Sequence, residues 1–497
     1  MKYILKPSEM RTADTTAIEL LKIPSIVLME NAARSASDFI KSKIQQNSSV
    51  LVLCGVGNNG GDGLALARHL SDYSDVQVLV LGNSEKMSDE TRTNYEILKK
   101  MGLPTSIISH EIEMECINFH VDCIIDSLIG VGGSENLRGL IIEILIKANS
   151  SNALKFSIDA PTGLNTLNGK THEHSFRADY TVTMYAIKSG MLLNNGAELC
   201  GETVIADLGA PQSIIKDLSK IFAIEKLDIR KIIKPRPRNS SKFDYGKVLI
   251  IAGSANYPGA AALAANAAVK SGAGLVYLYT PKIHSSLMPE VIPTFCHSES
   301  GVFTENFINS VMIAAQGCDA VAIGPGLGAD IRTIEFVKAI FSQLSAHIPL
   351  IIDADALRAI NENSVLRKNI VLTPHHGEFS RITKLSRQEI EENAMDLTQI
   401  WAEKLNCTIL LKNVPTIISN GDKTFFNLNG NPGMASGGSG DVLTGIIAGF
   451  LAQKMDTINS TALGAFVHAA AADYYKEKYS EMTISATDII ENLKNIL

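Results

Sequence analysis

Residues 431–445 read NPGMASGGSGDVLTG, a loop rich in glycine and serine that leads into an aspartate and then into an apolar run. Small residues let backbone N–H groups approach a ligand closely, and a helix beginning near Asp441 would direct the positive end of its dipole toward an anion. A carboxylate at that point can take the proton of an attacking hydroxyl. The segment therefore predicts a phosphate-binding loop with Asp441 as a base. The structural alternative is a glycine-rich turn before a core helix.

Other segments of the second half place polar or glycine-rich residues directly after apolar, strand-like runs. Because parallel strands end at one edge of a sheet, these segments are expected to meet there. His375 is a candidate active-site residue because it follows a strand and lies near Glu378, although a surface or capping histidine would fit the same pattern. Asp353 and Asp355 either bind magnesium or hydrogen-bond their own loop. The segments are GSANYPGAA (253–261), GPGLG (324–328), DADAL (353–357), TPHHGE (373–378) and KNVPT (412–416).

The first half contains a second glycine-rich loop, GVGNNGGDG (55–63), between a buried strand and a helix. Its glycines permit close approach of the backbone to a phosphate. A loop that only reverses the chain has little use for Asn58, Asn59 and Asp62 together. The loop is therefore a predicted binding site.

Two acidic strand ends accompany that loop, Asp126 after VDCII and Asp159 after KFSI. In one parallel sheet these carboxylates would converge with Asn59 and Thr162. Oxygen ligands of this kind suit a hard cation. Alternatively, the two aspartates only cap the helices that follow them.

The alternation of short strands with helix-length segments predicts an α/β fold with parallel sheets covered by helices. Two such series occur, and their different glycine motifs indicate two tandem domains rather than a repeat. We expect a first domain at 1–215, a linker at 216–240 that is rich in Pro, Arg and Ser toward its end, and a second domain at 241–497. Strands are expected at 49–55, 76–82, 121–126, 155–160 and 178–184, and then at 246–254, 273–281, 318–326, 349–357, 369–378 and 407–413.

Composition excludes several classes of protein. The 497 residues exceed the usual size of one core, and the net charge of −7 without a basic run argues against nucleic acid as a partner. No apolar run is long enough to span a membrane, and the N-terminus lacks the features of a signal peptide. The seven scattered cysteines fit a reducing cytoplasm and no zinc site or disulfide framework.

The first half resembles the N-terminal domain of the bifunctional NAD(P)H-hydrate repair enzymes, over about residues 8–210. The resemblance rests on LMENAAR (28–34), NNGGDG (58–63), GVGGSENLRG (130–139) after Asp126, DAPTGLN (159–165) and IKSG (187–190). It implies a Rossmann-like three-layer domain that epimerises the R and S hydrates of NADH and NADPH, with Asp159 handling the proton. It implies potassium at Asn59, Asp126 and Thr162, and substrate contacts from Asn58, Asn59, Gly60, Gly61, Asp62, Gly130, Val131, Gly132, Gly133, Ser134, Glu135, Asn136 and Asp159.

The loop after Asp126 departs from the usual family pattern, which is close to G-T-G-L-x-R. Val131, Gly133 and Glu135 occupy it here, so a threonine hydroxyl and an arginine are replaced. Backbone N–H groups of Gly132 and Gly133 can still act as donors. This departure leaves a non-catalytic nucleotide-binding module as an alternative for the first half.

The second half resembles the ADP- or ATP-dependent NAD(P)H-hydrate dehydratases, a ribokinase-like family, over about residues 240–490. NPGMASGGSGDVL is the most specific motif. The resemblance implies that Asp441 helps the C6 hydroxyl of the S hydrate attack the terminal phosphoryl group of ADP or ATP, with magnesium present, and that His375 is catalytic. The hydrated dinucleotide would contact Ala260, Gly326, His375 and Asp441, and the adenine nucleotide would contact Lys412, Asn413, Val414, Pro415, Thr416 and Gly440.

Asn413 stands where the family usually has glycine. A homo-oligomer acting on small molecules is also implied. The competing enzyme class is a ribokinase-like vitamin or sugar kinase, which would account neither for TPHHGE and KNVPT nor for the first half of the chain.

Overall fold

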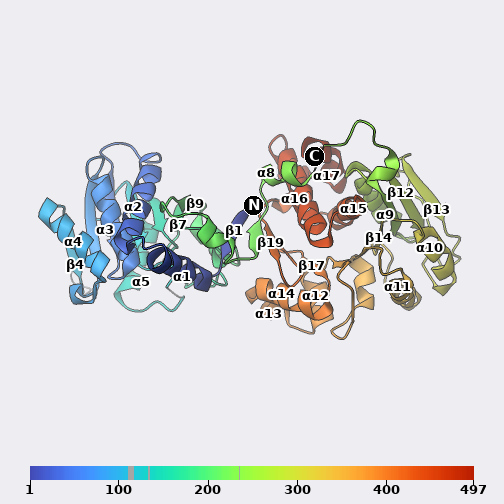
Figure 1. The fold of residues 1–497 in the computed structure, drawn as a ribbon, viewed down its shortest axis with the longest axis horizontal. Coiled ribbons are helices and arrows are strands. Elements are labelled where there is room, and N and C mark those ends of the chain that lie inside the picture. Colours follow the sequence, from blue (N-terminus) through green and yellow to red (C-terminus); the bar gives the residue numbers. More distant parts are fainter. Residues whose placement is uncertain (110–116, 133–134, 234) are drawn as a thin grey trace. The chain divides into compact units, whose positions relative to one another are not determined.

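The computed structural model describes residues 1–109, 117–132, 135–233 and 235–497 of the chain. It divides into two units, one formed by Tyr3–Lys220 and the other by Ile221–Leu497 together with Met1–Lys2 (Figure 1). Each unit is an α/β structure built on its own largely parallel sheet, so the predicted fold class is confirmed.

The first unit is built on a seven-stranded parallel sheet in the order β4-β3-β2-β5-β6-β7-β9, while β1 pairs separately with β8. The order reverses between β2 and β5, which creates the switch point where ligands bind in open α/β sheets. Its helices and strands are β1 (Lys2–Leu5), α1 (Pro7–Thr15), a π-helical turn (Thr16–Leu20), α2 (Ser25–Lys41), β2 (Ser49–Cys54), α3 (Asn58–Leu70), β3 (Asp75–Leu81), α4 (Asp89–Met101), β4 (Thr105–Ile108), β5 (Cys123–Ser127), α5 (Leu140–Ser150), β6 (Leu154–Ile158), β7 (Tyr180–Met184), β8 (Ile187–Lys188), α6 (Gly196–Cys200), β9 (Glu202–Ala206) and α7 (Ser213–Lys216).

Strand β2 shows why this sheet is the middle of three layers. Successive side chains of a strand point to opposite faces. Val50 and Val52 pack into the core that includes α2 and α3, whereas Leu51 and Leu53 pack into the core that includes α5. Both faces are buried, so the strand is apolar throughout and not alternating.

The second unit has a sheet in the order β13-β12-β11-β14-β15-β16-β17-β18-β19-β10. The strands are parallel from β13 to β17, β18 is antiparallel to both of its neighbours, and β10 is parallel to β19. Its helices and strands are β10 (Ile221–Ala223), α8 (Lys226–Ile232), β11 (Lys247–Ile251), α9 (Pro258–Lys270), β12 (Leu275–Thr280), β13 (Val291–Phe295), α10 (Ile308–Ala315), β14 (Ala320–Ile323), α11 (Ile331–Gln343), β15 (Leu350–Ile352), β16 (Ile370–Leu372), α12 (His376–Thr383), α13 (Arg387–Glu392), α14 (Ala394–Leu405), β17 (Thr408–Leu411), β18 (Thr416–Ser419), β19 (Thr424–Asn427), α15 (Ser439–Ala452), α16 (Thr457–Lys476) and α17 (Ala486–Asn492).

The small residues of α9 and α15 allow these two helices to pack backbone to backbone. A Cβ atom on Gly445 of α15 would lie 2.1 Å from the carbonyl oxygen of Ala264 in α9. Such a distance is far inside van der Waals contact, so only glycine fits. The alanine-rich helix 258–270 thus serves helix packing, and its N-terminal turn carries the candidate ligand contact Ala260.

The segment expected to be a linker, 216–240, contains regular structure. Ile221–Ala223 forms β10, which pairs with β19, and Lys226–Ile232 forms α8. The sequence reading missed both because each is short, and strand β10 is recognisable only through its pairing partner. Across the described ranges, no helix combines the length and apolar character needed to cross a membrane.

Candidate active sites

In the first unit, the glycine-rich loop after β2 meets the end of β5 at the switch point. The N–H of Gly55 donates to the carbonyl of Ser127 at 3.1 Å, and a Cβ on Gly55 would lie 2.1 Å from the carbonyl oxygen of Leu128. A Cβ on Gly60 would lie 1.8 Å from the carbonyl oxygen of Gly55. These glycines are therefore required for close backbone approach, and helix α3 begins directly behind them at Asn58.

A cavity of about 720 Å³ lies at this switch point. Of the predicted substrate residues, it is lined by Asn58, Asn59, Asp62, Gly130, Val131, Gly132 and Asp159.

The remaining predicted substrate residues of the first unit lie elsewhere. Gly60 and Gly61 are buried within α3 and pack against protein. Glu135 accepts a hydrogen bond from the side chain of Asn165 at 3.0 Å, and Asn136 lines a neighbouring pocket. Gly133 and Ser134 fall outside the described residues.

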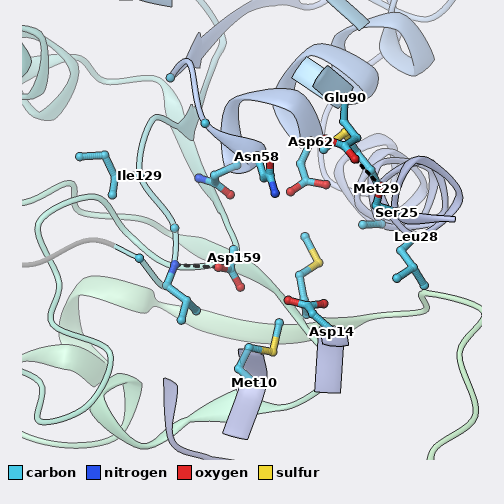
Figure 2. A pocket seen from close by; sticks show the side chains of 18 of the residues that line it. Met10, Asp14, Ser25, Leu28, Met29, Asn58, Asp62, Glu90, Ile129 and Asp159 are labelled. Carbon is cyan, nitrogen blue, oxygen red and sulfur yellow. Dashed lines mark hydrogen bonds between the residues drawn. The ribbon is translucent and has the colours of Figure 1, made fainter. Parts of the chain in front are cut away.

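Asp159 combines a strained backbone with two strong hydrogen bonds. Its φ angle is +68°, which is unfavourable for a residue other than glycine. One carboxylate oxygen accepts a hydrogen bond from the N–H of Val131 at 2.8 Å (Figure 2). The other accepts a hydrogen bond from Nζ of Lys188 at 2.7 Å. Lys188 is completely buried, and its ammonium also donates to the Thr183 hydroxyl at 2.5 Å and to the Met184 carbonyl at 3.1 Å. Asp159 is thus held in one orientation beside a desolvated cation.

Three further carboxyl groups line the same cavity, those of Asp14, Asp62 and Glu90 (Figure 2). Burial raises the pKa of Asp62 well above its usual value, and the charges of Asp159 and Asp14 add to this rise. Burial also raises the pKa of Asp14 to about 6, and the charge of Asp159 contributes. The cavity therefore holds acidic groups that can carry a proton near neutral pH.

Asp126 and Thr162 contact each other next to this cavity, and the backbone carbonyl of Asn59 accepts the hydroxyl of Ser127, the residue after Asp126. Asp126 is fully buried, and its carboxylate accepts the Thr162 N–H at 2.8 Å and the Thr162 hydroxyl at 2.7 Å. Burial raises the pKa of Asp126 to about 6, although its hydrogen bonds oppose the rise. In its preferred orientation, the side-chain amide of Asn59 donates a hydrogen bond to the Ile158 carbonyl and accepts one from the Gly130 N–H. Among the residues that the structure describes, Asp126 forms no ion pair, and a buried carboxylate beside hydroxyl and carbonyl oxygens fits a hard cation of low charge.

The second unit repeats this arrangement at its own switch point, between β11 and β14. The N–H of Gly253 donates to the carbonyl of Pro325 at 2.8 Å, which joins the loops after these two strands. Gly326 has a φ of +65°, and a Cβ there would lie 2.8 Å from the Cβ of Ala260. The predicted substrate residues Ala260 and Gly326 are therefore neighbours.

The buried Asp353 and the half-buried Lys412 form an ion pair at the ends of β15 and β17, with 2.7 Å between Oδ1 and Nζ. Asp353 also accepts the hydroxyls of Thr373 at 2.7 Å and Thr444 at 2.6 Å. Both carboxylate oxygens of Asp353 thus accept hydrogen bonds from protein donors, and these donors come from other elements and not from its own loop. A Cβ atom placed on Gly440 would lie 3.3 Å from Nζ of Lys412, so the lysine side chain faces the loop at the start of α15.

Asp441 lies in the first turn of α15, as its position after the glycines predicted. Burial raises its pKa to about 7, the charge of Asp353 adds to the rise, and Lys412 opposes it. A carboxylate with a pKa near the working pH is well suited to general base catalysis.

His375 is the N-cap of α12. Its Nδ1 accepts the N–H of Gly377 at 3.0 Å, and its backbone N–H donates to Glu378 at 2.9 Å. The imidazole is 60% exposed, so the capping alternative is realised while the ring remains accessible to a ligand. Residues 413–416 connect β17 to β18, with Thr416 at the start of β18 and Val414 largely exposed.

Several residues at these sites were not predicted. Lys188 lies in the quoted IKSG segment, but nothing in the segment indicates that its ammonium reaches Asp159. Asp14 comes from α1, far from any motif. His468 is buried in α16, and its Nε2 lies 3.2 Å from the Ser439 hydroxyl. These relationships depend on long-range contacts that no local pattern reports.

Comparison with known proteins agrees with this two-site architecture. Residues 25–190 match the family model of the YjeF-related protein N-terminus, and residues 248–495 match that of NAD(P)H-hydrate dehydratase. The second unit is similar to the crystal structure of a ribokinase-like superfamily protein from Enterococcus faecalis, with 31% identity, a TM-score of 0.50, and coverage of 56% of this chain and 95% of that chain.

Two curated relatives match over nearly their full length. The bifunctional NAD(P)H-hydrate repair enzyme of Moorella thermoacetica is 33% identical over 100% of this chain and 96% of its own. That of Thermofilum pendens is 34% identical over 99% of this chain and 96% of its own. The chain therefore belongs to the family of bifunctional NAD(P)H-hydrate repair enzymes.

Proposed function

We propose that the first unit interconverts the R and S hydrates of NADH and NADPH, and that the second unit dehydrates the S hydrate at the expense of ADP or ATP. The products are NADH or NADPH, phosphate, and AMP or ADP. The observation that carries this proposal is that each unit holds a carboxylate near a lysine at its strand ends, Asp159 with Lys188 and Asp441 with Lys412, in a chain of this family.

In the second unit, Asp441 takes the proton of the C6 hydroxyl as that oxygen attacks the terminal phosphoryl group. The lone pair of the ring nitrogen then expels phosphate, and loss of the C5 proton restores the double bond. Phosphorylation turns a poor leaving group into a good one, which explains the use of a nucleotide. We assign Ala260, Gly326 and His375 to the hydrated dinucleotide.

We place the adenine nucleotide along Lys412, Asn413, Val414, Pro415, Thr416 and Gly440. Lys412 supports this placement because its ammonium faces Gly440 while remaining paired with Asp353. A half-buried cation beside a glycine-rich helix start favours phosphate. Magnesium would arrive as the metal complex of the nucleotide, since the oxygens of Asp353 are already occupied by protein donors.

In the first unit, Asp159 exchanges a proton with the C6 hydroxyl of the hydrate. The seven cavity-lining residues identified above would contact the substrate. We assign Asn59, Asp126 and Thr162 to potassium, whose charge would balance the buried carboxylate and hold the adjoining loops together. Residues 133–136 would extend the contacts of the loop after β5.

The test is an assay on mixed R and S hydrates of NADH, with magnesium and potassium, to which the protein is added with ADP or with ATP. Recovery of reduced-nicotinamide absorbance from both epimers is expected, and the faster nucleotide identifies the phosphoryl donor. Recovery of the S share alone would leave only the dehydratase and make the first unit a binding module. No recovery with either nucleotide would refute the proposal.

We also propose the cellular compartment and the assembly state of the enzyme. The six cysteines of the described residues are free and buried, as suits a reducing cytoplasm. We expect a homo-oligomer, which sedimentation analysis of the full chain would measure.

A further inference from the structure

The cavity of the first unit contains a second carboxyl group placed to act on the substrate. Asp14, near the end of α1, lines the same cavity as Asp159 but comes from a different element. Figure 2 shows the side chains of Asp14 and Asp159 at two sides of this cavity, with Asp62 at a third. A ligand in the cavity would therefore have carboxyl groups on more than one side.

The backbone around these groups is strained in two places. Both Asp159, with φ of +68°, and Tyr185, with φ of +56°, adopt the left-handed conformation, and both line the cavity. Strained residues other than glycine cluster at functional sites. The Tyr185 hydroxyl is buried and makes no hydrogen bond of good geometry with the described residues, yet it lies close enough to Asp14 to lower the pKa of that carboxyl. The strained backbone at Tyr185 thus accompanies a buried hydroxyl group that lies beside Asp14.

The two carboxyl groups have different surroundings. Asp159 is hydrogen-bonded to the ammonium of Lys188 and to a backbone N–H. Asp14 forms no ion pair with any residue that the structure describes, and burial together with the charge of Asp159 raises its pKa to about 6. Two acidic groups in one cavity with opposed environments form an acid and base pair.

We propose that Asp14 is a second catalytic residue of the epimerase site, exchanging a proton with the ring nitrogen of the hydrate while Asp159 exchanges one with the C6 hydroxyl. This inference rests on the proposed function of the first unit. It goes beyond that function because it names the second proton carrier.

The step balances as follows. Asp159 removes the proton of the C6 hydroxyl, the C6–N1 bond breaks, and its electron pair moves to N1, which takes a proton from Asp14. This gives an open-chain aldehyde and an N–H conjugated with the carboxamide. Rotation about C5–C6 exposes the other face of the aldehyde. N1 then attacks C6, returns its proton to Asp14, and the new alkoxide takes the proton from Asp159, so no proton is gained or lost.

Other titratable groups also face Asp14 and must be considered in any pH dependence. Asp159 after β6 raises the pKa of Asp14 and of Asp62, Asp14 raises that of Asp62 in α3, and Lys188 of β8 lowers that of Asp14. Arg11 of α1 lines the cavity as well, and so does Glu90 of α4, which is hydrogen-bonded to Ser25. A variant of Asp14 must therefore be compared with a variant of Asp62.

The experiment starts from a single purified epimer of NADH hydrate and follows the other epimer by chromatography, without nucleotide and at substrate concentrations below saturation. The spontaneous rate is subtracted. For Asp14→Asn we expect at least a 100-fold loss of kcat/KM, with partial recovery in Asp14→Glu. In the wild type, kcat/KM should fall as pH rises above about 6, because the proton donor Asp14 ionises. The Asp62→Asn variant should show the same fall.

The control is Asp38→Asn, which removes the same charge from an exposed position on α2 that is 67% accessible. It should leave the rate within twofold of the wild type. An Asp14→Asn rate above one third of the wild type, with the decline at high pH retained, would overturn the role of Asp14. A wild type that fails to interconvert the epimers would instead refute the proposed function of the first unit.

The dehydratase activity of each variant on the S hydrate, measured with ADP, reports whether the rest of the chain is intact. If Asp14→Asn fails to fold, the pH profile of the wild type and the epimerisation rate of Asp14→Glu still test the catalytic role of Asp14. A profile without any decline between pH 6 and pH 8 would overturn the proposal.

Discussion

The Nζ of Lys188 lies 2.7 Å from Oδ1 of Asp159, and the lysine side chain is completely buried. Removing one member of a buried pair leaves the other charge uncompensated, which costs far more than the pair contributes as a whole. The position of the reactive carboxylate in the first unit therefore depends on a residue that need not touch the substrate.

Replacement of Lys188 by methionine should reduce both stability and epimerisation. We expect the free energy of unfolding of the first unit to fall by about 3 kcal/mol, because Asp159 is left without its cation. Circular dichroism during urea unfolding measures this loss. The fluorescence of Trp401, the only tryptophan, reports on the second unit and should show an unchanged transition. The double variant Lys188→Met with Asp159→Asn should recover part of the lost stability. If it does not, the uncompensated charge of Asp159 is not the cause of the loss in Lys188→Met.

Asp441→Asn should lower dehydration of the S hydrate by 100-fold or more while epimerisation continues. In the wild type, kcat/KM for dehydration should rise with pH and level off above about 7, since the base must be ionised and its pKa is raised to about 7. Stopped assays between pH 5.5 and pH 8.5 test this. Glu335→Gln, on the exposed surface of α11, is the matched control. A pH-independent rate would contradict the assignment of Asp441 as the base.

His468 should make the second unit sensitive to acid. Burial lowers its pKa to about 4, so the unfolded chain binds a proton that the folded chain does not. Stability from this group is complete above the unfolded value of 6.5 and is lost as pH falls toward 4, by about 2 kcal/mol between pH 7 and pH 5. Because the pKa of Asp441 is raised, the contribution of Asp441 to stability changes in the opposite direction over this pH range. The comparison must therefore be between wild type and His468→Gln.

Urea unfolding followed by Trp401 fluorescence at pH 7 and pH 5 measures that difference. The glutamine variant should lose less stability on acidification than the wild type. Equal losses in both proteins would show that His468 is not the group responsible. Because His468 contacts Ser439 next to the nucleotide loop, the variant should also raise the KM for ADP or ATP.

Gly55→Ala should abolish epimerisation, because the new Cβ would lie 2.1 Å from the Leu128 carbonyl oxygen and force β2 and β5 apart. Gly259→Ala, in α9 of the second unit, is the control for epimerisation. A Cβ there meets nothing within 4 Å. The control should retain most of its activity. Equal activity of both variants would contradict the close approach of the two strand ends.

Much of the architecture could be predicted from local patterns. Buried strands such as 49–54 are continuous apolar runs, and the glycine loops follow them directly, so strand ends and candidate ligand loops are visible in the sequence. The prediction that Asp441 starts a helix is confirmed, because glycine, serine and aspartate before an apolar run are a local signal. The short strands β18 and β19 and the structured segment 221–232 were missed, because pairing and not composition defines them.

The sequence by itself determined the class of fold, the family and the types of chemical group at each strand end, since these depend on residue type and on spacing of a few positions. Only the tertiary structure decided which groups meet. It brings Lys188 to Asp159, Asp14 into the same cavity, and Thr444 to Asp353 across 91 positions of the chain. Such pairs, and the burial that shifts their pKa values, arise from the packing of distant elements, which no local pattern encodes.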